Sequence, residues 1–192
     1  MKNKVVPTAL FAIFFAPILV AVVLNSKWVD WRAAPEKAHG ELIEPVVPLG
    51  EFEHIDAGGE PRDLHDVLDR WQLVFVSRQP CRNACLETTA LMHNIWLAQN
   101  RHRSEVGLIL LSAQELDPKT RRRIGKLESP WLLFDADAGR ALAQRLPESA
   151  DGSLYIVDPE ANILERFEPG ADLNGVRKDL DRLLTWTLRE QQ

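Results

Sequence analysis

The residues of this chain best suited to chemistry are its two cysteines, which lie four positions apart as Cys81 and Cys85. Disulfides that stabilise a fold usually join distant segments and close long loops, which this pair cannot do. Two thiols at this spacing instead suit reversible thiol–disulfide chemistry, or the shared capture of a soft metal ion such as copper(I). One helical turn separates the two Cα atoms, so a bond between them requires only a modest adjustment of a helix start.

The elements around the cysteines predict a strand-to-helix turn. An apolar run at residues 72–77 is typical of a buried strand, and a helix is expected after the cysteines as far as about Asn100. The free amide groups and the dipole of a helix start stabilise an anion such as a thiolate. Arg78 and Arg82 add positive charge there. We therefore expect nucleophilic or metal-binding cysteines, the alternative being two inert buried thiols.

The rest of the chain alternates between expected strands and helices. Strands are predicted at 52–56, 106–112, 131–134, 154–157 and 163–167, and helices at 63–71, 114–126, 137–146 and 172–188. This order predicts an α/β fold, a mixed sheet with helices on both faces. Reactive groups in such sheets gather at the carboxyl ends of strands, which is where the cysteines lie. The basic run Lys119–Lys126 could meet acidic lipid or protein, but a solvated helix face is favoured.

The amino-terminal run Val5–Leu24 carries no charge and predicts a single transmembrane helix. Its length of about 30 Å matches the hydrocarbon core of a bilayer. It is longer than the apolar region of a signal peptide and is followed by no convincing cleavage site. Trp28 and Trp31 come next, where aromatic side chains favour the membrane interface.

This run sets the expected organisation of the chain. We expect a short cytoplasmic tail at 1–4, the transmembrane anchor at 5–24, an interfacial segment and proline-containing linker at 25–50, and the α/β domain at 51–192. The short tail favours export of the larger part. In a bacterium this predicts a single-pass inner-membrane protein whose soluble domain is periplasmic, where disulfides persist. The formal net charge of −5 argues against nucleic-acid binding.

The α/β domain resembles the Sco/SenC/PrrC family, thioredoxin-like proteins that help to build the copper site of cytochrome c oxidase. The resemblance is carried by the C-x-x-x-C spacing of the cysteines, by Asp117-Pro118 after a strand, and by Leu154–Pro159 as a late strand and turn. It implies a thioredoxin-like fold and a redox or copper site at Cys81 and Cys85. It also implies a cytochrome c oxidase subunit or a copper chaperone as the partner.

The sequence departs from this family at several positions. Proline commonly follows each cysteine in the family, whereas Arg82 and Leu86 follow here. The copper site of the family takes a histidine from the loop before the late strand, and residues 147–153 contain none. Glu148 and Asp151 in that loop are hard oxygen ligands, which match copper(I) poorly. The proline that precedes this strand in thioredoxin-like reductases is also missing.

No other residue is expected to replace the missing copper ligand. Met92 shares the helix of the cysteines but lies roughly 10 Å along its axis from Cys85, so it is expected in the core. The five histidines are expected at the surface, in the linker or away from the site, namely His39, His54, His65, His93 and His102.

Three functions remain open from the sequence. The favoured one is a membrane-anchored thiol–disulfide factor in oxidase biogenesis, a possible oxidoreductase with Cys81 and Cys85 as catalytic residues. The missing histidine weakens the copper hypothesis, whereas thiol–disulfide exchange requires only an accessible thiolate and a resolving partner. The alternatives are a copper(I)-binding metallochaperone, in which the same cysteines are the metal ligands, and a non-catalytic assembly scaffold.

Overall fold

The computed structural model divides the chain into two units, Met1–Lys37 and Ala38–Gln192. It describes residues 13–17, 38–50, 53–55, 61–63, 69–134 and 136–190. In the first unit, residues 13–17 are helical, and the rest of the predicted anchor at 5–24 lies outside the described residues. Among the residues that are described, no helix has the length and apolar character needed to cross a membrane.

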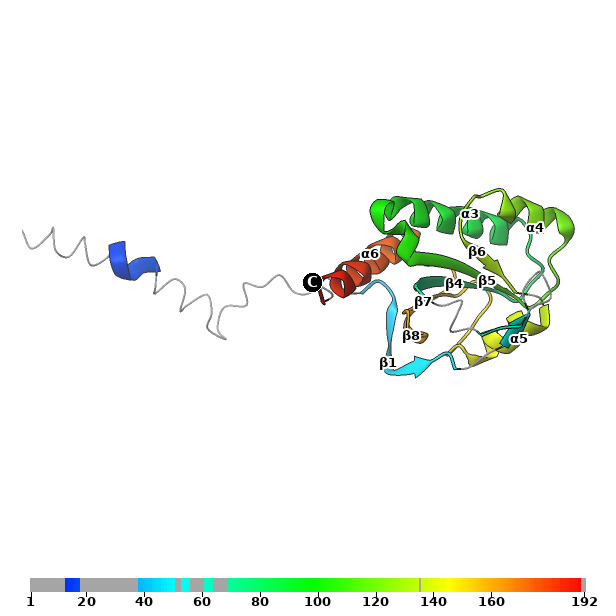
Figure 1. Cartoon of the computed structure of the whole chain (residues 1–192), viewed down its shortest axis with the longest axis horizontal. Helices are drawn as coiled ribbons and strands as arrows, with labels where there is room; N and C mark the ends of the chain where they lie inside the picture. Colours follow the sequence, from blue (N-terminus) through cyan, green and yellow to red (C-terminus); the bar gives the residue numbers. More distant parts are fainter. Residues whose placement is uncertain are drawn as a thin grey trace, which may run out of the picture. The chain divides into compact units, whose positions relative to one another are not determined.

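The second unit is built on a six-stranded mixed sheet with the strand order β1-β8-β7-β4-β5-β6 (Figure 1). Its strands are β1 (Glu41–Pro48), β4 (Trp71–Ser77), β5 (Val106–Ser112), β6 (Trp131–Leu133), β7 (Leu154–Val157) and β8 (Asn162–Phe167). The strands β4, β5 and β6 are parallel, whereas β7, β8 and β1 each pair antiparallel with their neighbours. A separate antiparallel pair is formed by β2 (Glu53–Ile55) and β3 (Pro61–Asp63).

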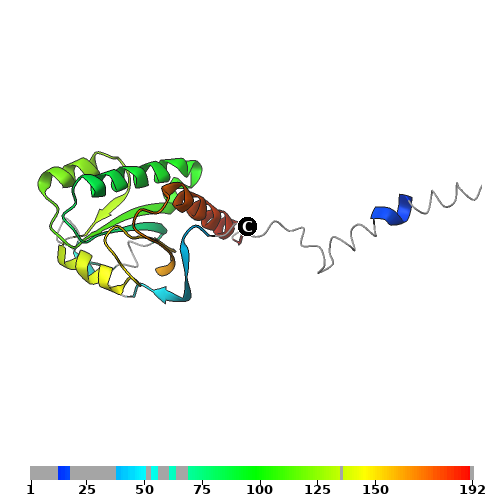
Figure 2. The same ribbon diagram turned by 180° about the vertical axis from the view of Figure 1, so that it is seen from behind.

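Helices cover both faces of the six-stranded sheet, as Figures 1 and 2 show. One face carries α3 (Asn83–Ala98), α4 (Pro118–Gly125) and α6 (Leu173–Glu190), and the other carries α5 (Ala136–Arg145). A short 3₁₀ helix, η1 (Asn100–Glu105), joins α3 to β5. The mixed sheet with helices on both faces, predicted from the order of elements, is confirmed.

The central strands explain this two-sided packing. Along β4, Leu73 and Phe75 belong to the core beneath α3, α4 and α6, whereas Val74 and Val76 belong to the core beneath α5. Every residue of β4 and of β5 is buried. A strand buried on both faces is expected to carry a run of apolar residues rather than an alternating pattern, as residues 73–76 and 108–111 do.

The start of α4 differs from the prediction for a physical reason. The helix was expected from residue 114, but it begins at Pro118. The carboxylate of Asp117 accepts hydrogen bonds from the backbone N–H groups of Lys119 at 2.9 Å and Thr120 at 3.0 Å. Proline suits the first position of a helix, where its missing N–H has no intrahelical acceptor. The cap and the proline therefore fix the start together.

The sheet begins earlier in the chain than the sequence pattern indicates. The predicted linker reaches residue 50, but β1 occupies Glu41–Pro48 and pairs with β8. Its register is irregular between Leu42 and Val47, a stretch that contains Pro45. Proline is tolerated in a strand at the edge of a sheet, because the missing donor there faces no partner. The prolines that suggested a spacer thus belong in part to an edge strand. Most of the helix predicted at 63–71 lies outside the described residues.

Candidate functional site

The two cysteines lie at the predicted strand-to-helix turn. The strand β4 ends at Ser77 and α3 begins at Asn83, so Cys81 precedes the helix and Cys85 lies in its first turn. The carboxyl ends of β4, β5 and β6 meet at this edge because the three strands are parallel. The pair therefore occupies the edge at which open α/β sheets ordinarily hold their reactive groups.

Cys81 and Cys85 form a disulfide, with their Cα atoms 5.1 Å apart. This separation lies within the ordinary range for disulfides. The side chains are only 7% and 8% exposed, and both belong to the core that also contains Phe75, Leu154 and Phe167. The sulfur atoms are thus packed against the core with a small part open to solvent. This is the closed state of a thiol pair.

The start of α3 carries no competing cap. Its N-cap residue, Arg82, makes no side-chain hydrogen bond to the helix, and the first turn contains no acidic residue. The amide N–H groups of the first turn therefore lack a side-chain acceptor, and the positive end of the helix dipole has no acidic counterpart there. If the disulfide opens, a thiolate at this position is stabilised by both effects.

The loop before β7 holds the segment that leads into the cysteines. A carboxylate oxygen of Asp151 accepts hydrogen bonds from the backbone N–H groups of Arg78 at 2.6 Å and Gln79 at 3.2 Å. The guanidinium of Arg78 donates to the carbonyl of Ser149 at 2.7 Å. The sequence suggested Asp151 only as a poor copper ligand, whereas the structure gives it a supporting role in this turn.

The described histidines are engaged elsewhere in the fold. The Nδ1 atom of His39 lies 3.2 Å from Asp179 on α6, Nδ1 of His93 lies 3.0 Å from the hydroxyl of Ser129, and Nε2 of His102 accepts from Arg101 at 2.9 Å. His65 and the side chain of His54 lie outside the described residues. No described histidine therefore joins the cysteine pair.

The described residues supply too few ligands for a copper(I) ion at the cysteine pair. In the part of the chain that the structure describes, no group of three or more His, Cys, Asp or Glu residues could hold a metal ion. Met92 is fully buried in the core. Copper(I) would find two sulfur atoms and no described third ligand, and the two sulfur atoms are bonded to each other. The residues present fit a disulfide couple better than a three-ligand copper site.

A second group of interacting side chains lies beneath α6, and sequence reasoning missed it. We call Glu165, Asp179, Arg182 and His39 the buried charge cluster. The guanidinium of Arg182 lies 3.0 Å from Glu165 and 3.4 Å from Asp179. The other oxygen of Asp179 accepts from the backbone N–H groups of His39 at 2.5 Å and Gly40 at 3.1 Å.

The environment of Glu165 changes its acidity. Its side chain is fully buried, and its Oε2 atom has no hydrogen-bond partner among the described residues. Burial, followed by the charge of Asp179, raises the pKa of Glu165 to about 7, although Arg182 acts in the opposite direction. The cluster therefore holds a carboxyl group that titrates near neutral pH. Its members come from β8, α6 and the segment before β1, so no local motif signals it.

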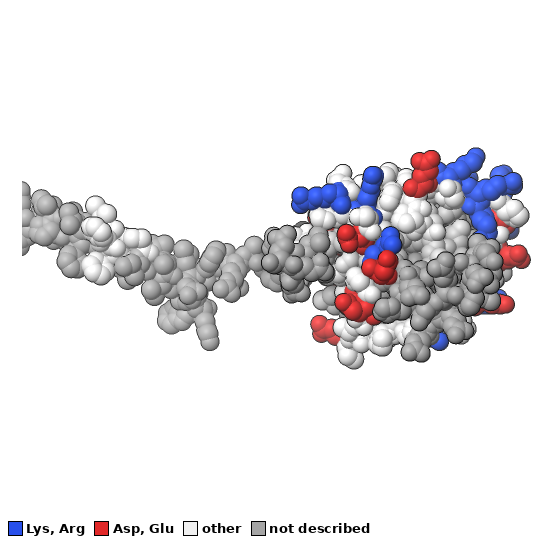
Figure 3. All heavy atoms as spheres, in the orientation of Figure 1, with Lys and Arg blue, Asp and Glu red and all other residues white. Residues whose placement is uncertain are grey.

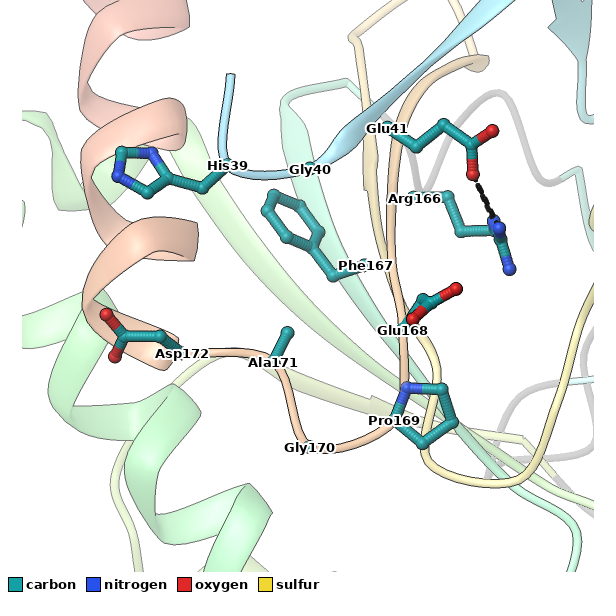
Figure 4. Close-up of a pocket in the computed structure, with 10 residues that line it drawn as sticks. All are labelled: His39, Gly40, Glu41, Arg166, Phe167, Glu168, Pro169, Gly170, Ala171 and Asp172. Atoms are coloured by element: carbon teal, nitrogen blue, oxygen red, sulfur yellow. Dashed lines mark hydrogen bonds and ion pairs between the residues drawn. The ribbon is translucent and has the colours of Figure 1, made fainter. Parts of the chain in front are cut away.

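An open pocket of roughly 600 Å³ lies where β8 ends and β1 begins (Figure 4). In it, Arg166 is bound by Glu41 at 2.5 Å and by Glu148 at 2.9 Å. Phe167 lines the pocket and shares a core with the cysteines, but neither cysteine lines it. The arginine is already neutralised by two carboxylates, so the pocket offers chemistry unlike that of the thiol pair.

Comparison with solved structures supports the thioredoxin-like fold. The apo Sco1 protein from Thermus thermophilus superposes with a TM-score of 0.59 at 18% identity, covering 81% of this chain and 99% of that one. A thiol:disulfide interchange protein from a Bacteroides species gives a TM-score of 0.56 at 14% identity, covering 73% and 90%. ScoI from Arabidopsis thaliana, solved with copper bound, gives 0.55 at 12% identity, covering 69% and 95%.

These similarities agree with the fold that the Sco resemblance implied, and at such identities they show the fold alone. No curated protein matches the sequence. Residues 71–187, which include both cysteines, match the family described as "Transmembrane-like, thioredoxin-like, C-terminal domain". The chain therefore belongs to this family of thioredoxin-like domains.

Proposed function

We propose that the chain is a membrane-anchored thiol–disulfide factor that assists cytochrome c oxidase biogenesis, with Cys81 and Cys85 as its catalytic pair. The observation that carries this proposal is the disulfide between them at an uncapped helix start. A pair that closes four residues apart can open and close without rearranging distant parts of the chain. The family and the likeness to a thiol:disulfide interchange protein support the same chemistry.

The reaction begins with the reduced form. A thiolate of the pair attacks a client disulfide, forms a mixed disulfide and releases one client thiolate, which takes up a proton. The second cysteine, as a thiolate, then attacks the mixed disulfide and releases the other client thiol. The client disulfide gains two electrons and becomes a dithiol, while Cys81 and Cys85 lose two electrons and become the disulfide. A dithiol reductant returns the pair to its starting state.

The client and the location are part of this proposal. The Sco/SenC/PrrC resemblance favours an oxidase subunit or a copper chaperone as the client. The uncharged run at 5–24 favours anchoring in a bacterial inner membrane, with the thioredoxin-like domain in the periplasm. Copper binding is not favoured, because the described residues supply no third ligand.

The proposal is tested by trapping the mixed disulfide. The full chain is expressed as Cys81→Ser, as Cys85→Ser and as the double variant, and complexes are separated on non-reducing gels. One single variant should trap a client that is released by a reductant, and the double variant should trap none. Two results together would overturn the proposal: no complex with either single variant, and full oxidase activity with the double variant. They would favour a scaffold.

A copper titration distinguishes the proposed thiol–disulfide factor from a copper(I) metallochaperone. The reduced full chain is titrated with copper(I) under anaerobic conditions, against the double variant as the control. We expect the two proteins to bind copper equally weakly. Tight binding that depends on the cysteines would favour a metallochaperone instead.

A further inference from the structure

A second pocket lies on the face of the sheet covered by α3 and α4, and the thiol chemistry does not use it. Its volume is roughly 600 Å³. We call it the α3–α4 pocket, and its walls include His93, Trp96 and Leu97 from α3, Arg103 from η1, and Lys126 and Leu127 after α4. Trp96 lies eleven residues beyond Cys85 on α3, which is about 16 Å along the helix axis. A small molecule bound there lies well away from the cysteines.

The floor of this pocket is held rigidly. The ring of Trp96 stacks on the ring of His93 with centroids 6.0 Å apart, and the guanidinium of Arg103 lies 5.6 Å from the Trp96 ring. The indole N–H donates to the carbonyls of Arg103 at 2.8 Å and Val106 at 3.1 Å. Nδ1 of His93 contacts the hydroxyl of Ser129 at 3.0 Å. Because these side chains are already fixed, a ligand would lose little binding energy in ordering them.

The surroundings of the pocket are basic, although the whole chain carries a net charge of −5. Figure 3 shows Lys and Arg side chains gathered over the end of the molecule where α4 lies in Figure 1. The exposed cations of α4 and its C-cap are Lys119, Arg121, Arg122, Arg123 and Lys126, and Arg103 of η1, which lines the pocket, is exposed as well. Within the described part of the chain, none of them forms an ion pair with an acidic side chain, and Glu128 is the one carboxylate that lines the pocket. The surface is therefore complementary to a negatively charged partner.

The pocket also offers apolar contact between its charges. Leu97 is 42% exposed, which is high for a leucine, and Leu127, which also lines the pocket, is half-buried. A flat surface such as a bilayer would meet the exposed cations of α4 but would leave this recess unfilled. A peptide can place carboxylates on Arg103 and Lys126 while one apolar side chain packs against the leucines that line the pocket.

We infer that the α3–α4 pocket and its basic surroundings dock a protein partner through a short acidic segment that carries one apolar side chain. The inference goes beyond the proposed function and does not depend on the redox state of the cysteines. A partner held at this pocket by its acidic segment lies beside the domain while the thiol pair, at the other end of α3, remains free to react.

The test uses the purified full chain in non-ionic detergent and a fluorescein-labelled peptide of glutamates around a central leucine and phenylalanine. Fluorescence anisotropy should show binding in the micromolar range. A peptide with lysine in place of each glutamate should bind at least tenfold more weakly. The variant Arg103→Glu, Lys126→Glu should weaken binding of the acidic peptide at least tenfold, and Leu97→Ser severalfold.

A matched control carries the same change of charge elsewhere. Arg140→Glu, Arg177→Glu places it on α5 and α6, and should leave the affinity within about twofold, since distant charges are screened by salt. Circular dichroism verifies that each variant is folded. Equal weakening by the two double variants, or unchanged affinity in Arg103→Glu, Lys126→Glu, overturns the inference.

The same variants separate a lipid surface from a protein partner. Phosphatidylglycerol is added to the micelles, and the tryptophan fluorescence of the full chain is followed. A change that requires Arg103 and Lys126, together with no binding of the acidic peptide, would assign the surface to lipid and overturn docking of a protein.

Discussion

The cysteine pair and the buried charge cluster lie on the same face of the sheet, but one undergoes redox chemistry and the other undergoes protonation. The cysteine pair at the start of α3 gains or loses electrons, and the buried charge cluster beneath α6 gains or loses protons. The disulfide is uncharged and can be buried at no electrostatic cost. In the cluster, the carboxyl groups of Glu165 and Asp179 are almost fully buried, and both are paired with the partly exposed guanidinium of Arg182. We therefore expect changes to the cluster to act mainly on stability, and changes to the cysteine pair to act mainly on chemistry, with a smaller effect on stability.

The largest effect on stability is expected from Arg182→Met, which breaks the cluster. Glu165 and Asp179 would remain buried together without the guanidinium that contacts both. Removing one partner of a buried ion pair typically costs about 3–5 kcal/mol. Urea unfolding of the oxidised protein should show a loss of this size. Arg177→Met on the same helix is the control, and an equal loss in both would contradict the special role of Arg182.

The next effect is a dependence of stability on pH that Glu165→Gln should remove. Burial raises the pKa of Glu165 from 4.5 to about 7, so the folded state holds this proton more tightly than the unfolded state does. The contribution to stability is therefore fully present below pH 4.5 and is lost as the pH rises to about 7. From the size of the shift we expect a loss on the order of 3 kcal/mol.

Urea unfolding at several pH values measures this slope. The native protein should lose stability between pH 4.5 and 7, whereas Glu165→Gln should lose clearly less across the same range. The other members of the cluster, Asp179, Arg182 and His39, are unchanged in this variant. Parallel curves for the two proteins would show that Glu165 is not the group responsible.

A smaller effect is expected when the cysteine pair is opened. The disulfide joins residues four positions apart, so it closes a very short loop. The chain-entropy relation gives a contribution of about 2 kcal/mol for such a loop. Denaturation with and without dithiothreitol measures it, with the Cys81→Ser, Cys85→Ser variant as the reference. A loss greater than about 4 kcal/mol would indicate a mainly structural bond.

The smallest effect is expected from Asp151→Ala, which releases the turn before Cys81. Asp151 is exposed and accepts two backbone hydrogen bonds, so its loss should cost about 1 kcal/mol. The more informative measurement is the rate at which dithiothreitol reduces the disulfide, which should rise as the turn loosens. Asp181→Ala on α6 is the control. Equal rates of disulfide reduction in the two variants would show that Asp151 does not influence the cysteine pair.

The two regions also differ in how far the sequence predicts them. The apolar run of β4, the turn and α3 follow one another along the chain, so local patterns predict both the elements and the position of the cysteines between them. The bounds of β5 match those predicted because the run is apolar up to its last residue, Ser112. The cluster depends on His39, Glu165 and Asp179, which only tertiary folding brings together.

Dependence on tertiary folding also explains why the sequence pattern predicts a linker where β1 lies. The residues of this edge strand are mostly exposed, and two of them are prolines. Its sequence therefore resembles an extended spacer. What identifies it is the pairing with β8, more than a hundred residues later in the chain. Likewise, Asp151 could be seen in the sequence, but the two amides it binds could not.

The early start of the sheet also limits how far the domain can lie from its proposed membrane anchor. With β1 in the sheet and His39 bound to α6, the folded unit starts at Ala38. If the run at 5–24 is anchored as proposed, the segment between the anchor and the folded unit is residues 25–37 rather than 25–50. At about 3.3–3.6 Å per residue its greatest reach falls from about 90 Å to about 45 Å. A client must then present its disulfide close to the membrane surface, and freely diffusing proteins would meet the cysteines less often than neighbours in the same bilayer.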